Sequence, residues 1–328
     1  MIKMSKVKLV IISGMSGVGK SSTAQKLAAL CKSEQINHTW YHEEMDNHPI
    51  RWADGGEFSV GPIETREGMA RNLEDMYQRW EKLVNQMKKQ DGLHIMEGCL
   101  FQAIIRYFFH SPLTRGEVMD YYHKVFEILE PLSPHIIFLY RPNVEESFKK
   151  AFKIRGERWK NIILDSEDEY YFKSHEYKGE ESVYLMEADY QNFAGEIFDS
   201  YKGHKLKVDT SGEKWKLYMD TISHFLDIKP KKKLQHISVK SLSQYCGTFE
   251  FTVDNQKQTI QVIQENNQLY ARFSWFKYVE MHMIDEHYFE LLSFPIYFRY
   301  SFKNEEPIID VSGNYGWNII GQTLYKIS

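Results

Sequence analysis

Residues 14–21 read Gly14-Met15-Ser16-Gly17-Val18-Gly19-Lys20-Ser21, and this stretch decides the fold of the N-terminal part of the chain. It fits the pattern G-x-x-x-x-G-K-[ST], the P-loop, whose glycines let backbone N–H groups turn inward around phosphate oxygens. In such a loop the lysine reaches the β- and γ-phosphates, and the hydroxyl that follows it ligates Mg²⁺. The sequence therefore predicts that residues 14–21 and the adjoining Ser22 bind nucleotide phosphates, with Lys20 as a catalytic cation and Ser21 as a metal ligand.

The segments on either side of the loop have the secondary structure that the motif requires. The β-branched run at residues 7–13 predicts a buried strand. After the loop, apolar residues recur at helical spacing from Ala24 to Cys31. Because a helix N-terminus carries partial positive charge, a helix that begins at the loop adds to its affinity for phosphate.

The composition is that of an ordinary soluble globular protein. The chain has 328 residues, which favours two domains, and 42% of them are hydrophobic and 26% charged. A net charge of −4 gives no electrostatic reason to expect broad binding to nucleic acid or membranes. Three cysteines far apart, Cys31, Cys99 and Cys246, favour reduced thiols in a cytoplasmic protein. We expect no signal peptide, because no charged region followed by an apolar region precedes the first strand. We expect no spanning helix, because no apolar run approaches ~18 residues.

Strand-like and helix-like patterns alternate as far as about residue 226. The runs that predict strands after the P-loop are 36–41, 93–96, 135–140 and 205–208. The runs with helical character are 64–90, 99–130, 143–155, 181–202 and 213–226, with a break at Ser111-Pro112. Strands that alternate with helices predict an α/β fold with a parallel sheet built from βαβ units. We assign residues 1–227 to this first, nucleotide-binding domain.

The pattern changes after residue 227. Residues 228–238 contain four lysines and predict a solvated linker, with a phosphate-binding patch as the alternative. From residue 239 to 328, short alternating runs are separated by polar turns such as 264–268, which predicts hairpins. This part is typical of a smaller all-β antiparallel barrel or sandwich domain.

Acidic residues follow two of the predicted strands, where ligands bind in open α/β sheets. Glu97 ends the third strand, and it either activates an acceptor hydroxyl or holds Mg²⁺ through water; the alternative is an exposed turn glutamate. The second strand ends in a polar cluster with Glu43, Glu44 and Asp46. We expect at least one of these three to contact the acceptor or the metal. His48, in the same segment, is interpreted as a loop histidine.

Two arginines are candidates for a lid over the phosphates. Arg155 and Arg158 are three residues apart, which places them on one face of a helix, just before a polar stretch. Guanidinium groups delivered by a lid would stabilise the phosphoryl group in transfer. The alternative is ion pairing with Glu157 on an exposed helix. Arg141, after the fourth strand, is a weaker candidate.

Residues 7–226 resemble the P-loop kinases of nucleosides, nucleotides and small molecules, including bacterial proteins described as thymidylate-kinase-like. The resemblance is carried by residues 14–21, Glu43-Glu44, Glu97, Phe138-Leu139-Tyr140-Arg141-Pro142, the R-x-x-R pair and Asp209-Thr210-Ser211. It implies a three-layer fold with strand order 2-3-1-4-5, the cofactors ATP and Mg²⁺, and contact between the adenine and the loop that contains Thr210 and Ser211. Two features depart from the family, and they leave the acceptor open. No arginine follows Glu97 directly, and the Asp-Arg pair of thymidylate kinases is missing.

The C-terminal domain is similar to small lipocalin-like β-domains that are appended to some bacterial hydrolases. This resemblance begins at Tyr245-Cys246-Gly247-Thr248-Phe249. It leaves two alternatives open, since such a barrel either binds a ligand or is filled by its own aromatic side chains.

Three functions are consistent with these patterns. The first is an ATP-dependent phosphotransferase that acts on a hydroxyl or phosphate of a small molecule. The second is a nucleotide-dependent switch or ATPase whose C-terminal domain binds a ligand or partner, although the base-reading pattern [NT]-K-x-D of GTPases is missing. The third is a kinase of nucleic-acid ends, which the acidic balance disfavours. We favour the first, with a small-molecule acceptor, no nucleic acid, no membrane, and a homodimer as one open possibility for the oligomeric state.

Overall fold

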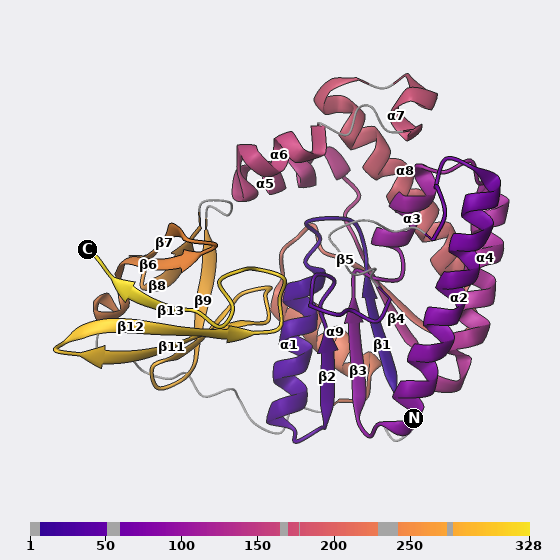
Figure 1. Ribbon diagram of the computed structural model, residues 1–328. Helices are drawn as coiled ribbons and strands as arrows, with labels where there is room; N and C mark the ends of the chain where they lie inside the picture. Colours follow the sequence, from indigo (N-terminus) through magenta and orange to yellow (C-terminus); the bar gives the residue numbers. More distant parts are fainter. Residues whose placement is uncertain (1–6, 51–59, 165–169, 177, 229–241, 274–277) are drawn as a thin grey trace. The chain divides into compact units, whose positions relative to one another are not determined.

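The computed structural model of the chain (Figure 1) contains an α/β part and a β-barrel part. It describes residues 7–50, 60–164, 170–176, 178–228, 242–273 and 278–328. Apart from Ile228, the expected linker 228–238 lies outside the described residues, so the domain boundaries stay a prediction.

The chain divides into two compact units. The first consists of Met1–Glu43, Asn47–Lys149 and Ile162–Lys232. The second consists of Glu44–Asp46, Lys150–Asn161 and Lys233–Ser328. Two short segments that precede residue 227 are therefore grouped with the C-terminal residues, which the sequence did not predict.

A parallel five-stranded sheet forms the centre of the first unit. Its strands are β1 (Leu9–Ser13), β2 (His38–Tyr41), β3 (Leu93–Glu97), β4 (His135–Tyr140) and β5 (His204–Asp209). Their order is β2-β3-β1-β4-β5, which confirms the prediction. All residues of β1 are buried, as expected for the central strand of a sheet covered on both faces. The register pairs Ile12 with Glu97, which places the end of β3 beside the start of the P-loop.

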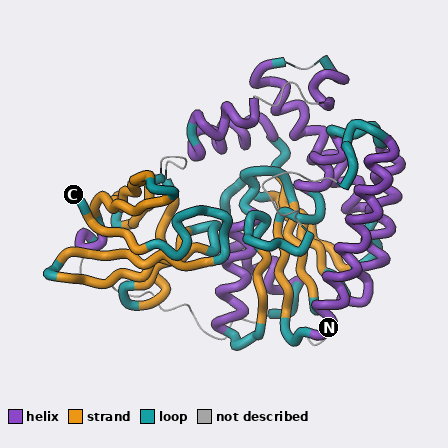
Figure 2. Tube along the Cα trace, viewed as in Figure 1, coloured by secondary structure: helices purple, strands orange, loops and turns teal. Residues whose placement is uncertain are grey.

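Helices cover both faces of this sheet and make a three-layer sandwich (Figures 1 and 2). On one side lie α1 (Lys20–Ser33) and α9 (Trp215–Phe225). On the other side lie α2 (Arg66–Lys89), α4 (Arg115–Leu129) and α8 (Gly179–Ser200). In the part of the chain that the structure describes, the remaining helices of more than one turn are α3 (Gln102–Phe109), α5 (Val144–Arg155), α6 (Glu157–Leu164) and α7 (Tyr170–His175).

The long helix α2 shows how the sequence directs these layers. Thr65 caps its N-terminus by accepting a hydrogen bond from the Gly68 N–H, 3.0 Å away. Its predicted apolar stripe faces the core, where Trp80 is fully buried. The indole N–H of Trp80 donates to the Tyr121 hydroxyl at 2.9 Å, so α2 and α4 are joined by a satisfied polar contact within the core. Among the described residues, no helix has the length and apolar character needed to cross a membrane.

The second unit contains a closed antiparallel barrel, which decides between the predicted barrel and sandwich in favour of the barrel. Its strands are β6 (Gly247–Val253), β7 (Gln256–Glu265), β8 (Gln268–Arg272), β9 (Val279–Asp285), β10 (Tyr288–Leu291), β11 (Ile296–Lys303), β12 (Glu306–Gly313) and β13 (Thr323–Lys326). The predicted hairpin turn is present between β7 and β8, where Asn266 and Asn267 have φ of 48° and 62°.

The barrel interior is filled by side chains from its own strands. Phe249, Phe289 and Phe298 are almost completely buried there. Tyr245, just before β6, packs edge-on against Phe289, with ring centroids 4.8 Å apart. Of the two alternatives left by the sequence, the described residues favour a packed module.

Candidate functional site

The P-loop is held tightly between neighbouring elements of the first unit. Gly14 has a φ of 149°, and a Cβ there would lie 2.2 Å from the carbonyl oxygen of Leu139 in β4. Gly19 has a φ of 95°, and a Cβ there would lie 2.2 Å from the Trp215 ring of α9. Only glycine fits these two positions, because both the backbone conformation and the space exclude a side chain.

Lys20 and Ser21 open α1 directly after this loop. The Lys20 side chain is 5% exposed, and its ammonium group donates to the carbonyl oxygen of Met15, 3.3 Å away. The lysine thus lies against the loop that it is predicted to serve. No acidic side chain lies in the first turn of α1, so its partial positive charge remains available to an anion.

Glu97 is the buried acid of the site. Its side chain is fully buried at the end of β3, and its Oε1 accepts hydrogen bonds from the Ser21 hydroxyl at 3.1 Å and from the Glu43 N–H at 3.3 Å. Its other oxygen, Oε2, is buried and has no hydrogen-bond partner among the described residues. Burial raises the pKa of Glu97 to about 8, with a further increase from the charge of Glu43 and a smaller opposing effect from Lys20.

Glu43 lies beside Glu97 because residue 98 is a glycine. Gly98 has a φ of 74°, and a Cβ there would lie 2.0 Å from the Glu43 carboxylate. The ends of β2 and β3 therefore bring two carboxyl groups together, within the same unit as Lys20 and Ser21. The sequence identified both acids but not the role of Gly98, which only the close approach of the two strand ends makes visible.

The other two predicted acids and the two lid arginines are placed differently. Glu44 and Asp46 belong to the second unit, where the Glu44 carboxylate accepts a hydrogen bond from the Tyr315 hydroxyl. Arg155 also belongs to that unit and is the last residue of α5, while α6 begins at Glu157. The expectation that Arg155 and Arg158 share one helix face is wrong, because Gly156, with a φ of 90°, separates the two helices. The side chain of Arg158 lies outside the described residues, and the lid stays a prediction.

The loop after β5 lies against the P-loop. In the kinases that the chain resembles, this loop is expected to contact the adenine. Thr210 is fully buried, and its hydroxyl donates to the carbonyl oxygen of Val18 at 3.0 Å. The Arg141 guanidinium lies 3.4 Å from the Thr210 hydroxyl and 3.4 Å from the Glu213 carboxylate. Ser211 follows at the exposed side of the loop. Thr210 thus adjoins the P-loop directly, and Arg141 contacts Thr210; the contact of Thr210 and Ser211 with a base stays a prediction.

Gln191 is a supporting residue that the sequence did not reveal. From α8, its side-chain oxygen accepts the Arg141 N–H at 3.1 Å, and its side-chain amide donates to the Arg141 carbonyl oxygen at 2.9 Å. Both backbone groups of Arg141 are therefore satisfied by one side chain far along the chain. A glutamine within an amphipathic helix carries no signal of such a role.

His48 and Cys99 form a second unexpected pair near the acids. His48 lies in the loop after β2, as interpreted from the sequence, but it is buried there, with only 5% of its surface exposed. The Ile50 N–H donates to its Nδ1 at 3.1 Å, and its Nε2 lies 3.0 Å from the Cys99 sulfur. The Cys99 thiol in turn donates to the Glu97 carbonyl oxygen at 3.0 Å. The pair ties the segment after β2 to the segment after β3.

A metal ion at this site would depend on few protein ligands. Among the described residues, no group of three or more His, Cys, Asp or Glu side chains is arranged to hold a metal. The Ser21 hydroxyl and the Glu97 carboxyl group offer hard oxygen ligands. They suit Mg²⁺, which binds through one or two protein oxygens together with phosphates and water.

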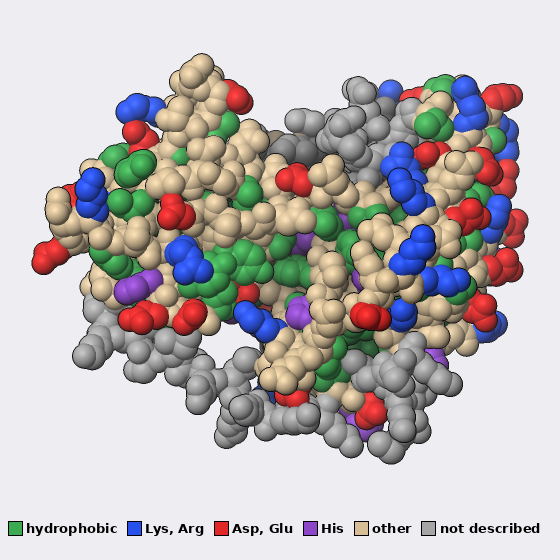
Figure 3. Space-filling view, turned by 60° about the horizontal axis from the view of Figure 1, so that its bottom comes forward, with side chains coloured by type: hydrophobic (Ala, Val, Ile, Leu, Met, Phe, Trp, Pro, Cys, Tyr) green, Lys and Arg blue, Asp and Glu red, His purple; other side chains and the backbone are tan. Residues whose placement is uncertain are grey.

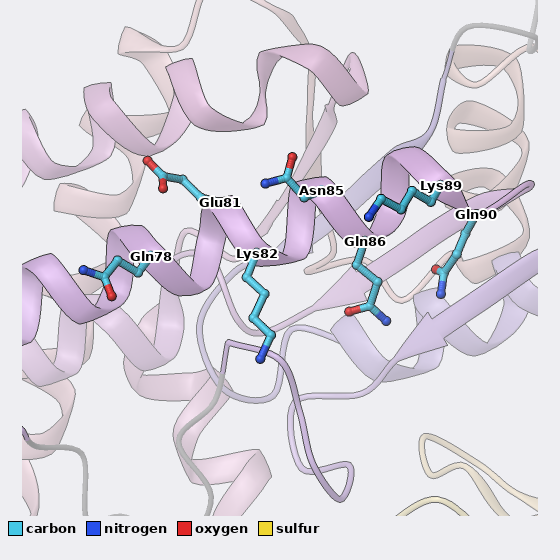
Figure 4. Close-up of a pocket in the computed structure, with 7 residues that line it drawn as sticks. All are labelled: Gln78, Glu81, Lys82, Asn85, Gln86, Lys89 and Gln90. Atoms are coloured by element: carbon cyan, nitrogen blue, oxygen red, sulfur yellow. The ribbon is translucent and has the colours of Figure 1, made fainter.

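A hollow of about 590 Å³ lies elsewhere, on the outer side of α2 (Figure 4). It is lined by polar side chains that all project from α2 or the residue after it: Gln78, Glu81, Lys82, Asn85, Gln86, Lys89 and Gln90. None of these belongs to the P-loop or to the strand ends, so this hollow is not the nucleotide site.

Comparisons with known proteins show a likeness of fold only. The chain matches no protein-family model and no curated protein. It is similar to the solved structure of YorR from Bacillus subtilis in complex with phosphorylated GDP, with 12% identity over 69% of this chain and 100% of that chain and a TM-score of 0.40. A sulfotransferase from Alicyclobacillus acidocaldarius matches with 15% identity over 72% and 87% of the two chains and a TM-score of 0.36. The protein APE1195 matches with 17% identity over 68% and 96% and a TM-score of 0.33. Values this low carry no argument about activity, so the assignment of an α/β P-loop fold rests on the strand order and loop geometry of this chain itself.

Proposed function

We propose that the protein is an ATP-dependent phosphotransferase that acts on a hydroxyl group of a small molecule. The observation that carries this proposal is the Glu97 carboxyl group. It is fully buried, is joined through Oε1 to the P-loop hydroxyl of Ser21, and keeps Oε2 without a partner among the described residues. A buried oxygen without a partner destabilises a fold unless a ligand uses it.

The phosphate side of the reaction belongs to the P-loop. Residues 14–22 would surround the triphosphate, with Lys20 on the β- and γ-phosphates. The loop that contains Thr210 and Ser211 would lie near the adenine. Ser21 and Glu97 would supply protein oxygens for Mg²⁺, which when bound neutralises the charge of the phosphates. Arg155 and Arg158 remain candidates for a lid that stabilises the phosphoryl group.

The acceptor side belongs to Glu97 and Glu43. The acceptor hydroxyl would donate a hydrogen bond to Oε2 of Glu97 and attack the γ-phosphorus as the bond to the β–γ bridging oxygen breaks. ADP then leaves, and the hydroxyl proton passes to Glu97 and on to solvent. A pKa of about 8 suits this role, because such a carboxyl group can take up and release a proton near neutral pH. Glu43, held beside it over Gly98, would orient the acceptor.

A small-molecule acceptor is favoured over nucleic acid by the charge distribution. Lys and Arg side chains are intermingled with Asp and Glu side chains on the face drawn in Figure 3, and the net charge of the chain is −4. Proteins that follow a nucleic-acid backbone present a basic stripe or patch.

The test is ADP release by the purified chain in the presence of ATP, Mg²⁺ and pools of hydroxylated metabolites. We expect one pool to accelerate ADP release and to yield a phosphorylated product in equal amount. Glu97→Gln should abolish this acceleration and still bind ATP, whereas Lys20→Ala should lose most of the binding. ATP binding with only slow hydrolysis in every pool would contradict the proposal and favour the nucleotide-dependent switch.

A further inference from the structure

We propose that His42 is a positioning residue that fixes the Glu97 carboxyl group and leaves Oε2 as its working oxygen. This inference rests on the proposed phosphotransferase function. His42 carries no motif and was not a candidate from the sequence. The structure places its Nε2 3.3 Å from Oε1 of Glu97.

The two oxygens of Glu97 have different surroundings. Oε1 accepts hydrogen bonds from the Ser21 hydroxyl and the Glu43 N–H, and it also faces the His42 ring nitrogen. Oε2 is equally buried, with no hydrogen-bond partner among the described residues. Three polar groups on one oxygen set the plane of the carboxyl group, so the other oxygen is the one available to an acceptor hydroxyl.

His42 is suited to hold Oε1 when a nucleotide is bound. The Ser21 hydroxyl is also the expected Mg²⁺ ligand of the P-loop, so its contact with Glu97 is shared with the metal. His42 lies outside the P-loop pattern, so the motif assigns it no contact with the metal or the phosphates. It directly follows β2 and is 3% exposed. Its ring stands edge-on to Trp40, with centroids 5.6 Å apart and an interplanar angle of 63°, which restricts the rotation of the imidazole.

Loss of the His42 ring nitrogen would free the carboxyl group to turn. The Glu43 N–H and the Ser21 hydroxyl would remain, but Ser21 is the contact that the metal competes for. The acceptor hydroxyl would then meet Glu97 in more than one orientation. Because catalysis depends on placing reacting groups within a few tenths of an ångström, turnover should fall while nucleotide binding stays unchanged.

The experiment compares three variants in the ADP-release assay with the acceptor pool that the wild type uses. His42→Leu removes the ring nitrogen, His42→Gln keeps a side-chain N–H of similar reach, and His42→Asn keeps an N–H that is too short to reach Oε1. We expect kcat to fall about 10- to 100-fold in His42→Leu and His42→Asn, with KM for ATP changed less than about twofold. His42→Gln should recover most of the loss, which a purely structural role would not produce.

His38→Leu is the matched control, since His38 lies on β2, the strand that His42 directly follows. Among the hydrogen bonds of the described residues, its ring contacts only the nearby Ile36 carbonyl. His38→Leu should leave kcat unchanged. If His42→Leu fails to fold, the kcat values of His42→Gln and His42→Asn are compared instead, and a higher kcat in His42→Gln supports the role of the side-chain N–H. Equal kcat in wild type and His42→Leu, or equal losses in the Gln and Asn variants, would overturn the role of His42 alone. A wild-type chain that binds ATP but releases no ADP with any acceptor would overturn the proposed function, and this inference with it.

Discussion

Glu97→Gln should stabilise the nucleotide-free protein, and the gain should grow with pH. The folded pKa of Glu97 is raised by burial to about 8, above its ordinary value of 4.5. The unfolded chain therefore ionises at Glu97 first, and stability is lost as pH rises from about 4.5 to about 8. At about 1.4 kcal/mol per pKa unit, the full loss is at most on the order of 5 kcal/mol, and relaxation around the ionised group would reduce it. Glutamine keeps the shape of the protonated acid and has no such loss.

The measurement is urea unfolding of wild type and Glu97→Gln at pH 5, 6, 7 and 8. We expect nearly equal free energies of unfolding at pH 5 and a difference of a few kcal/mol in favour of the variant at pH 8. Glu117→Gln is the control, because the Thr114 N–H and hydroxyl lower the pKa of Glu117 to about 2. The stability that Glu117 contributes is lost only below about pH 4.5. Between pH 5 and pH 8, the free energy of unfolding of Glu117→Gln should therefore change with pH in the same way as that of the wild type. A parallel curve for Glu97→Gln would refute the reasoning about its buried charge.

Three further substitutions test separate parts of the structure. Gly98→Ala should lower kcat at least 10-fold, because the added Cβ would displace the Glu43 carboxylate. ADP release measures kcat, and titration calorimetry should show little change in ATP affinity. An unchanged kcat would mean that Glu43 is not part of the site. Gln191→Ala should lower the free energy of unfolding by about 1–3 kcal/mol in urea melts, since it leaves the Arg141 backbone groups unsatisfied, while the exposed neighbour Asn192→Ala should change little. Phe298→Ala should cost about 3–5 kcal/mol, because its ring is fully buried inside the barrel; a smaller loss would mean that the interior is loosely packed.

The fold could be predicted from the sequence because its signals are local. The P-loop pattern, the β-branched run before it and the helical period after it occupy adjacent residues. The Asn266-Asn267 turn similarly marks a hairpin within a few residues. Local backbone preference and burial pattern agree in these segments, and such agreement is what specifies a fold.

The site could be predicted only in part, because its geometry comes from contacts between distant segments. Glu43 and Glu97 were found from their positions at strand ends, where ligands bind in α/β sheets. The roles of His42 and Gln191 could not be predicted, because each depends on a residue far along the chain. His42 lies beside Glu97, and Gln191 in α8 binds the backbone of Arg141. The spacing of Arg155 and Arg158 cannot show that a helix ends between them. Gly156 adopts a left-handed conformation that ends α5 after Arg155.

Magnesium should relieve the cost of the buried Glu97 charge, and this gives a final prediction about the metal. A cation near the Glu97 carboxyl group favours its ionised form and offsets the burial that raises its pKa. Ligands that bind only the folded state stabilise it, and at a given concentration a tighter ligand stabilises it more. Thermal unfolding of the wild type should therefore shift upward with ADP alone and further with ADP and Mg²⁺. In Glu97→Gln the shift with ADP should remain and the additional shift with Mg²⁺ should shrink, because an amide oxygen is a weaker ligand than a carboxylate. Sodium chloride at equal ionic strength controls for screening by salt. If Mg²⁺ raises the unfolding temperature equally in the two proteins, the metal is held by Ser21 and the phosphates without Glu97. The Glu97 carboxylate would then act only on the acceptor.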